Sequence, residues 1–107
     1  MNIQTIKKVG ARLRRTPKHL GEIAMESGVE PRIVKEAIRE LRIAGVPIVS
    51  GQEGYWMWNG KDESWKNFIA QMNKEKARKD ELIDAMVEAS AKRQLLTVKD
   101  AIEELSK

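Results

Sequence analysis

The feature that most constrains the fold is a pair of short segments with helical periodicity, joined by a turn of three or four residues that contains Gly28. The first segment, residues 17–27, has Thr16 as a candidate N-cap and Pro17 at the first helical position. The second segment is residues 31–43. Two helices this close in sequence are expected to pack against each other across the turn.

The apolar residues of this pair fall where two crossing helices meet. Ala24 is small at the point where the first helix must let the second approach closely, and Val29, Val34 and Ile38 fall at positions that wedge the two helices together. Gly45 follows the second helix and is a candidate for a left-handed C-cap. The pattern predicts a helix-turn-helix unit.

An amphipathic segment precedes this unit. Residues 3–15 place Ile6, Val9 and Leu13 at i, i+3 and i+7 and carry basic residues around the rest of the surface, which predicts a helix.

The pattern becomes strand-like in residues 45–60. Two runs rich in β-branched and aromatic residues, VPIVS and GYWMW, are separated by GQE, which predicts a β-hairpin. Alternation places Trp56 and Trp58 on one face of the second strand and Tyr55 and Met57 on the other, so that one pair faces the helical core. The remaining pair is free to cover the next helix. Stacking on single-stranded nucleic acid is the alternative role, but packing is favoured because so small a domain has few other large residues.

Helical patterns return after Gly60. Asp62 or Ser64 can cap a helix whose apolar stripe includes Trp65 and Phe68, and Thr97 begins a last short helix. A polar stretch of nine residues separates two of the stripes and would carry the second one away from a small globule. We therefore expect residues 80–106 to pair with a second copy, through Leu82, Ile83, Met86, Val87, Ile102 and Leu105.

The order helix, helix, turn, helix, hairpin resembles the winged helix-turn-helix DNA-binding domain of the biotin-repressor type, found in small bacterial and phage regulators. The resemblance covers residues 4–58 and rests on LGEIAMESGVEPRIVKEAIRELRIAG and the following GVPIVS and GYW. It implies an α+β fold, mainly α with a small β-hairpin, over residues 1–60, followed by a C-terminal helical extension over residues 61–107. The rest of the chain is too short for a ligase domain, so the biotin-linked activity is not expected.

The charge distribution agrees with a polyanionic partner. The net charge is +4, and all of the excess lies before Lys61, because ten Lys and Arg residues there face six Glu, whereas the two signs cancel afterwards. On the predicted helix 31–43 we expect base contacts from Arg32, Lys35, Glu36 and Arg39. Phosphate contacts are expected from Arg12, Arg14, Arg15, Lys18 and Arg42.

The tip of the predicted wing offers Ser50 and Gln52 as polar contacts and carries Glu53 but no basic residue. Such a wing departs from the more basic wings that are common in this class, and we expect it to bind the minor groove weakly.

The composition argues against other classes of protein. There is no cysteine, and the single histidine, His19, has no second ligand nearby in sequence, so neither a metal site nor a cofactor is expected. No carboxylate is paired with a histidine, a nucleophile or a phosphate loop, so the protein is not expected to be an enzyme. The absence of a long apolar run predicts a cytoplasmic protein with no membrane contact.

The function predicted from the sequence is sequence-specific binding of double-stranded DNA by a prokaryotic or phage transcriptional regulator that acts as a homodimer. Two alternatives stay open. One is a DNA-binding subunit of a phage replication or packaging complex that recruits a protein partner through its C-terminal helices. The other is a winged-helix protein-interaction module, in which the charged helix face is solvated or binds protein.

Overall fold

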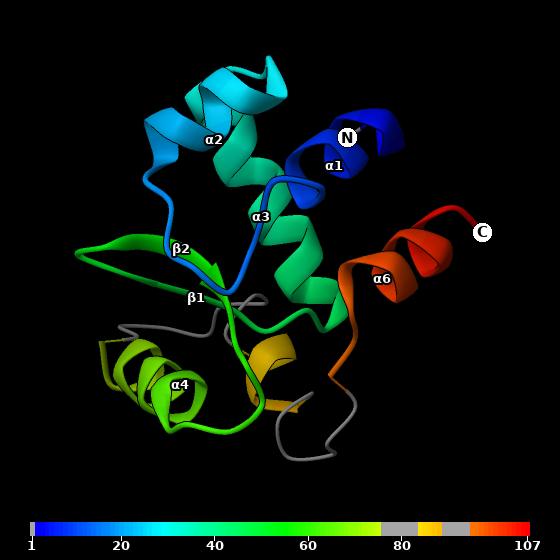
Figure 1. Ribbon diagram of the computed structural model, residues 1–107. Helices are drawn as coiled ribbons and strands as arrows, with labels where there is room; N and C mark the ends of the chain where they lie inside the picture. Colours follow the sequence, from blue (N-terminus) through cyan, green and yellow to red (C-terminus); the bar gives the residue numbers. More distant parts are fainter. Residues whose placement is uncertain (1, 76–83, 89–94) are drawn as a thin grey trace.

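The computed structural model describes residues 2–75, 84–88 and 95–107 of the chain. Figure 1 shows a mainly helical molecule with a two-stranded antiparallel sheet, as the α+β prediction required. Residues 84–88 form a further helical stretch. The labelled elements are α1 (Ile3–Gly10), α2 (Leu20–Ser27), α3 (Pro31–Ala44), β1 (Ile48–Gly51), β2 (Gly54–Met57), α4 (Ser64–Glu75) and α6 (Val98–Leu105).

The predicted pair of helices is present as α2 and α3. Gly28 ends α2 with a φ of 71°, a left-handed conformation that favours glycine, and its N–H donates to Ala24 O at 3.0 Å. Gly45 closes α3 in the same way, with a φ of 111°. Val34 and Ile38 are buried between the helices. The turn and both glycine caps are therefore confirmed.

The connection between α1 and α2 differs from the prediction. Helix α1 ends at Gly10 instead of continuing to residue 15, and α2 begins at Leu20 with His19 as its N-cap, so Thr16 and Pro17 do not start a helix. The chain instead runs alongside β2. Lys18 and Tyr55 form an antiparallel bridge, in which Lys18 N donates to Tyr55 O at 2.9 Å and Tyr55 N donates to Lys18 O at 2.8 Å. Backbone pairing with β2 thus prevails over the local capping signal.

The hairpin lies between two layers of helices (Figure 1). Strands β1 and β2 pair from Ile48 opposite Met57 to Gly51 opposite Gly54. Tyr55 and Met57 pack on the core formed by α1, α2 and α3, whereas Trp56 and Trp58 pack with Trp65 of α4. The alternation of faces is as predicted, and the pair that does not face that core covers the next helix.

The core formed by α1, α2 and α3, which we call the first core, also includes α6. Ala101 of α6 is buried, and Val98 and Ile102 pack against the same cluster, which also contains Val9 and Leu41. Gly10 of α1 makes this contact close, since a Cβ atom there would lie 2.5 Å from Cγ1 of Val98. Residues from both ends of the chain therefore contribute to this core.

The second core lies on the other face of the hairpin. Met86 is only 1% exposed and packs with Val49 and Trp65. Met86 and Ile102, predicted to pair with a second copy, thus pack inside the protein. Val87 and Leu105 are 36% and 37% exposed, while Leu82 and Ile83 lie outside the described residues.

The described helices include none with enough length and apolar character to cross a membrane.

Candidate nucleic-acid interface

The outward face of α3 carries the four residues predicted to contact bases. Arg32, Lys35, Glu36 and Arg39 are all exposed. Helical periodicity places Arg32, Glu36 and Arg39 close to the side of α3 opposite its buried stripe, with Lys35 beside them. At 1.5 Å per residue, the seven positions from Arg32 to Arg39 correspond to about 10 Å of helix. The predicted base-contacting set therefore stays together as one exposed, predominantly basic surface, which we call the α3 face.

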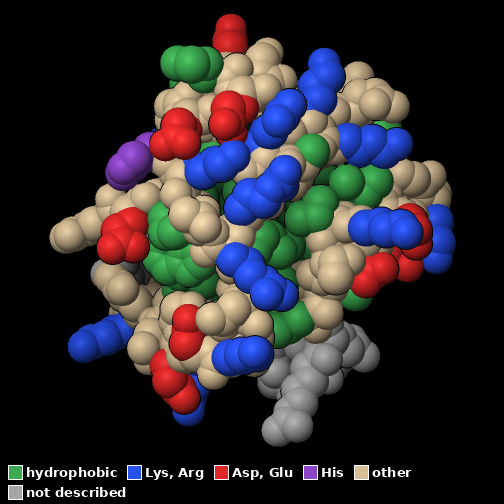
Figure 2. Space-filling view, viewed as in Figure 1, with side chains coloured by type: hydrophobic (Ala, Val, Ile, Leu, Met, Phe, Trp, Pro, Cys, Tyr) green, Lys and Arg blue, Asp and Glu red, His purple; other side chains and the backbone are tan. Residues whose placement is uncertain are grey.

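A second basic group gathers around Glu26 of α2. Lys18 Nζ donates to Glu26 Oε1 at 2.5 Å. This hydrogen bond lowers the pKa of Glu26, and the charges of Lys18, Arg12 and Arg14 lower it further. Figure 2 shows lysine and arginine side chains gathered over α1 and its connection to α2. Arg12, Arg14 and Lys18, three of the residues predicted to contact phosphates, thus lie near the carboxylate of Glu26, which the sequence did not single out.

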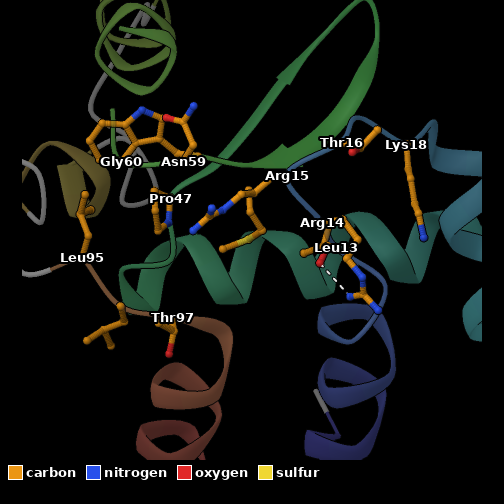
Figure 3. A pocket seen from close by; sticks show the side chains of 13 residues that line it. Leu13, Arg14, Arg15, Thr16, Lys18, Pro47, Asn59, Gly60, Leu95 and Thr97 are labelled. Carbon is orange, nitrogen blue, oxygen red and sulfur yellow. Dashed lines mark hydrogen bonds between the residues drawn. The ribbon is translucent and has the colours of Figure 1, made fainter. Parts of the chain in front are cut away.

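Arg14 and Arg15 are adjacent in sequence and both exposed, but they are used differently. One Arg14 amino group, Nη1, donates to Ala11 O at 2.6 Å and to Leu13 O at 3.1 Å, which turns its guanidinium toward the end of α1. Figure 3 shows Arg15 extending in another direction, toward Pro47 and Asn59.

The expectation that Arg42 contacts a phosphate is wrong. Its side chain is 8% exposed, and its Nε donates to Ile48 O at 2.9 Å. The guanidinium carbon lies 4.8 Å from the centre of the Phe68 ring and 5.9 Å from that of Tyr55, which are suitable distances for cation–π contacts. Burial lowers the pKa of Arg42 to about 10, so the side chain is still charged at neutral pH. Arg42 links the two cores.

The position of Arg42 on the helix explains why the sequence did not reveal this role. At about 100° per residue, Arg42 lies about 80° from Val34 and Lys35 about 100° from it, so the two differ little around the helix axis. Arg42 and Lys35 differ in their position along the helix axis. The C-terminal half of α3 is covered by the hairpin and α4, and this cover widens the buried stripe to include Arg42 but not Lys35.

The turn of the hairpin lies in the predicted segment, but of the two polar residues expected at its tip only Gln52 is exposed there. Gln52 and Glu53 form the exposed turn between Gly51 and Gly54, and Ser50 is half-buried within β1. Gly54 holds the base of the turn against the start of α2, because a Cβ there would meet the backbone of Lys18 and lie 2.8 Å from His19 N. The hairpin is therefore fixed close to α2.

His19 is exposed, and its side chain makes no capping hydrogen bond to α2. Within residues 2–75, 84–88 and 95–107, no group of three or more His, Cys, Asp and Glu side chains is arranged to hold a metal ion.

Comparisons of the chain with protein-family models, with curated proteins and with solved structures find no match. The α3 face and the basic group around Glu26 are the features of the described residues that bear on function.

Proposed function

We propose that this protein binds double-stranded DNA sequence-specifically as a winged helix-turn-helix domain, with α3 as the recognition helix in the major groove. The observation that carries the proposal is the α3 face. Arginine and lysine donors project from the second helix of a helix-turn-helix pair, the position from which such domains read base edges. Arginine pairs bidentately with guanine, and Glu36 is suited to accept from a cytosine amino group.

The basic group around Glu26 supplies the second part of the proposal. Arg12, Arg14 and Lys18 lie at the entrance to α2, where contacts to phosphates fix the position of a recognition helix without reading sequence. The hairpin takes the place of the wing. Because its exposed turn carries Glu53 and no basic residue, the proposal assigns most of the affinity to α3 and to the α1–α2 connection.

A transcriptional role in bacteria or phage, and homodimeric binding, remain part of the proposal. Residues 84–88 and α6 support a dimer less than expected, because Met86 and Ile102 pack inside the protein. The exposed part of that predicted surface is Val87 and Leu105.

The test is selection of bound duplexes from a random pool, with the mass of the complex recorded. A consensus with one half-site indicates a monomer, and two half-sites about one turn of DNA apart indicate a dimer. Arg32→Ala is expected to cost about 1–3 kcal/mol on the selected site and to relax the preference at one base pair. Arg12→Ala is expected to weaken all sequences alike and to reduce the slope of log K against log salt by about 1.

Lys66→Ala is the matched control, since it also removes one exposed positive charge, but from α4 and not from the α3 face or the basic group around Glu26. It is expected to leave duplex affinity and salt dependence unchanged. If Arg32→Ala and Arg12→Ala both behave like Lys66→Ala, the recognition-helix model is wrong.

One observation favours a protein-interaction role as the second candidate. Met25 of α2 is 84% exposed, the largest exposed fraction among the large apolar residues of the described chain. Exposed methionines suit protein contacts. Absence of salt-dependent binding to any duplex, together with a partner whose binding is lost in Met25→Gln, would select this candidate.

A further inference from the structure

An open pocket of about 810 Å³ lies between the α1–α2 connection, the residues after β2 and the start of α6 (Figure 3). Small-molecule sites in proteins usually enclose about 300–1,000 Å³ and are lined by apolar side chains with a few polar groups. This pocket is separate from the α3 face, because no residue of α3 lines it.

Backbone hydrogen bonds hold the walls of the pocket in place. Each wall is tied to a neighbouring part of the fold. The three bonds are Met57 N to Arg14 O at 2.7 Å, Trp58 N to Pro47 O at 3.0 Å, and Leu96 N to Gly45 O at 2.8 Å. A pocket whose walls are fixed before binding loses little conformational freedom when a ligand enters.

Apolar surface lines most of the cavity. Pro47 and Met57 contribute from the hairpin side and Leu96 from the segment that leads into α6. The indole of Trp58 has a fixed orientation, since its Nε1 donates to Asp62 O at 3.0 Å and to Asp62 Oδ1 at 3.2 Å. A flat apolar body fits such walls better than a flexible polar one.

Arg15 supplies the positive charge. Its side chain extends across the pocket toward Pro47 and Asn59 (Figure 3). The other two basic residues of the lining are engaged elsewhere, Arg14 with carbonyl oxygens of the α1 end and Lys18 with Glu26. For Arg15, the described part of the chain provides no hydrogen-bond or ion-pair partner. A guanidinium beside apolar walls is suited to bidentate recognition of a carboxylate.

We propose that this pocket binds a small monoanion with a flat apolar body, of the class of aromatic carboxylates, with Arg15 pairing to the carboxylate. The proposal goes beyond DNA binding and does not depend on it, because the pocket is complete without α3. A phosphate of a nucleic acid is the other anion that Arg15 can meet, so the experiment separates the two.

The probe is 2-naphthoate, with the neutral 2-naphthamide as its matched control, titrated into the whole chain without DNA. Indole N–H signals of the three tryptophans are followed by two-dimensional NMR and assigned with Trp58→Phe. We expect a saturable shift of the Trp58 signal and little change at Trp65, which is 3% exposed and lies outside the lining. Naphthoate is expected to bind about 10-fold or more tightly than naphthamide.

The variants test the charge. Arg15→Ala is expected to abolish the preference for naphthoate over naphthamide, whereas Arg12→Ala, which removes an exposed arginine outside the pocket, should keep it. Equal binding of the two probes, equal effects of the two variants, or absence of a saturable Trp58 shift would each overturn the proposal. If Arg15→Ala changes only duplex affinity, Arg15 is a phosphate contact and the pocket proposal fails while DNA binding stands.

Discussion

The close approach of Gly54 to the backbone of Lys18 makes Gly54→Ala the sharpest test of the fold. Gly54 has a φ of 114°, and a Cβ there would collide with Lys18 O, a backbone atom that cannot rotate away. Relief of the collision requires the α1–α2 connection to separate from β2. That movement breaks the two hydrogen bonds between Lys18 and Tyr55, at 2.9 and 2.8 Å.

The expected magnitude follows from two contributions. A left-handed conformation costs an L-residue about 1–2 kcal/mol, and each lost backbone hydrogen bond costs about 1 kcal/mol. Gly54→Ala should therefore lower the free energy of unfolding by about 3–4 kcal/mol. Gly28→Ala isolates the first contribution, because Gly28 also has a positive φ but open space around its Cβ position, and it should cost about 1–2 kcal/mol.

Gly21→Ala completes the series. Gly21 lies within α2 with nothing near its Cβ position, so alanine should stabilise the protein by about 0.5–1 kcal/mol through helix propensity. The assay is urea unfolding followed by circular dichroism, with midpoints and m-values compared. If Gly54→Ala costs no more than Gly28→Ala, the α1–α2 connection does not pack against the hairpin as described.

Three further predictions concern α6, the start of α4 and the basic group. Gly10→Ala should lower the free energy of unfolding by about 1–3 kcal/mol, because the added Cβ overpacks against Val98. Val98→Ala should therefore cost less stability in the Gly10→Ala protein than in the wild type. If the two costs are additive in urea unfolding, α6 does not dock on α1 as described. Asp62 accepts from Ser64 N and Oγ at 2.9 and 2.6 Å, and these hydrogen bonds lower the pKa of Asp62. The stability that Asp62→Ala removes should therefore be present above pH 3.8 and lost as pH falls through the lowered pKa. The measurement is the difference in thermal midpoint between the wild type and Asp62→Ala, and a difference that does not shrink in acid would refute the prediction. Glu26→Gln should tighten duplex binding in a salt-dependent manner, because it releases Lys18 from its ion pair. Glu22→Gln on the same helix should have a smaller effect. Both are measured by fluorescence anisotropy titration, and equal effects of the two variants would mean that only net charge matters.

The sequence predicted correctly those features that depend on only a few neighbouring residues. Gly28 and Gly45 marked helix ends because left-handed caps are nearly a glycine property, and the alternation of Tyr55, Trp56, Met57 and Trp58 fixed which residues share a strand face. Of the candidate site, the α3 face followed from helical periodicity alone.

Long-range packing determined the rest. Thr16 and Pro17 resemble a helix start, but pairing of Lys18 with Tyr55, 37 positions away, favours an extended backbone. Met86 and Ile102 looked available for a second copy because periodicity identifies an apolar face without identifying what covers it. Arg42 was misassigned for the same reason, since only the tertiary cover over the C-terminal half of α3 distinguishes it from an exposed arginine.

The contact between α1 and α6 has a consequence for biosynthesis. Ribosomes make the chain from its N-terminus, so α1, α2, α3 and the hairpin are synthesised before Val98 and Ala101 of α6. During that interval Val9 and Leu41 lack the helix that completes their core, and the apolar surface beside Gly10 is open to water and to chaperones. We therefore expect the nascent chain to gain its full protection from proteolysis only after α6 has emerged.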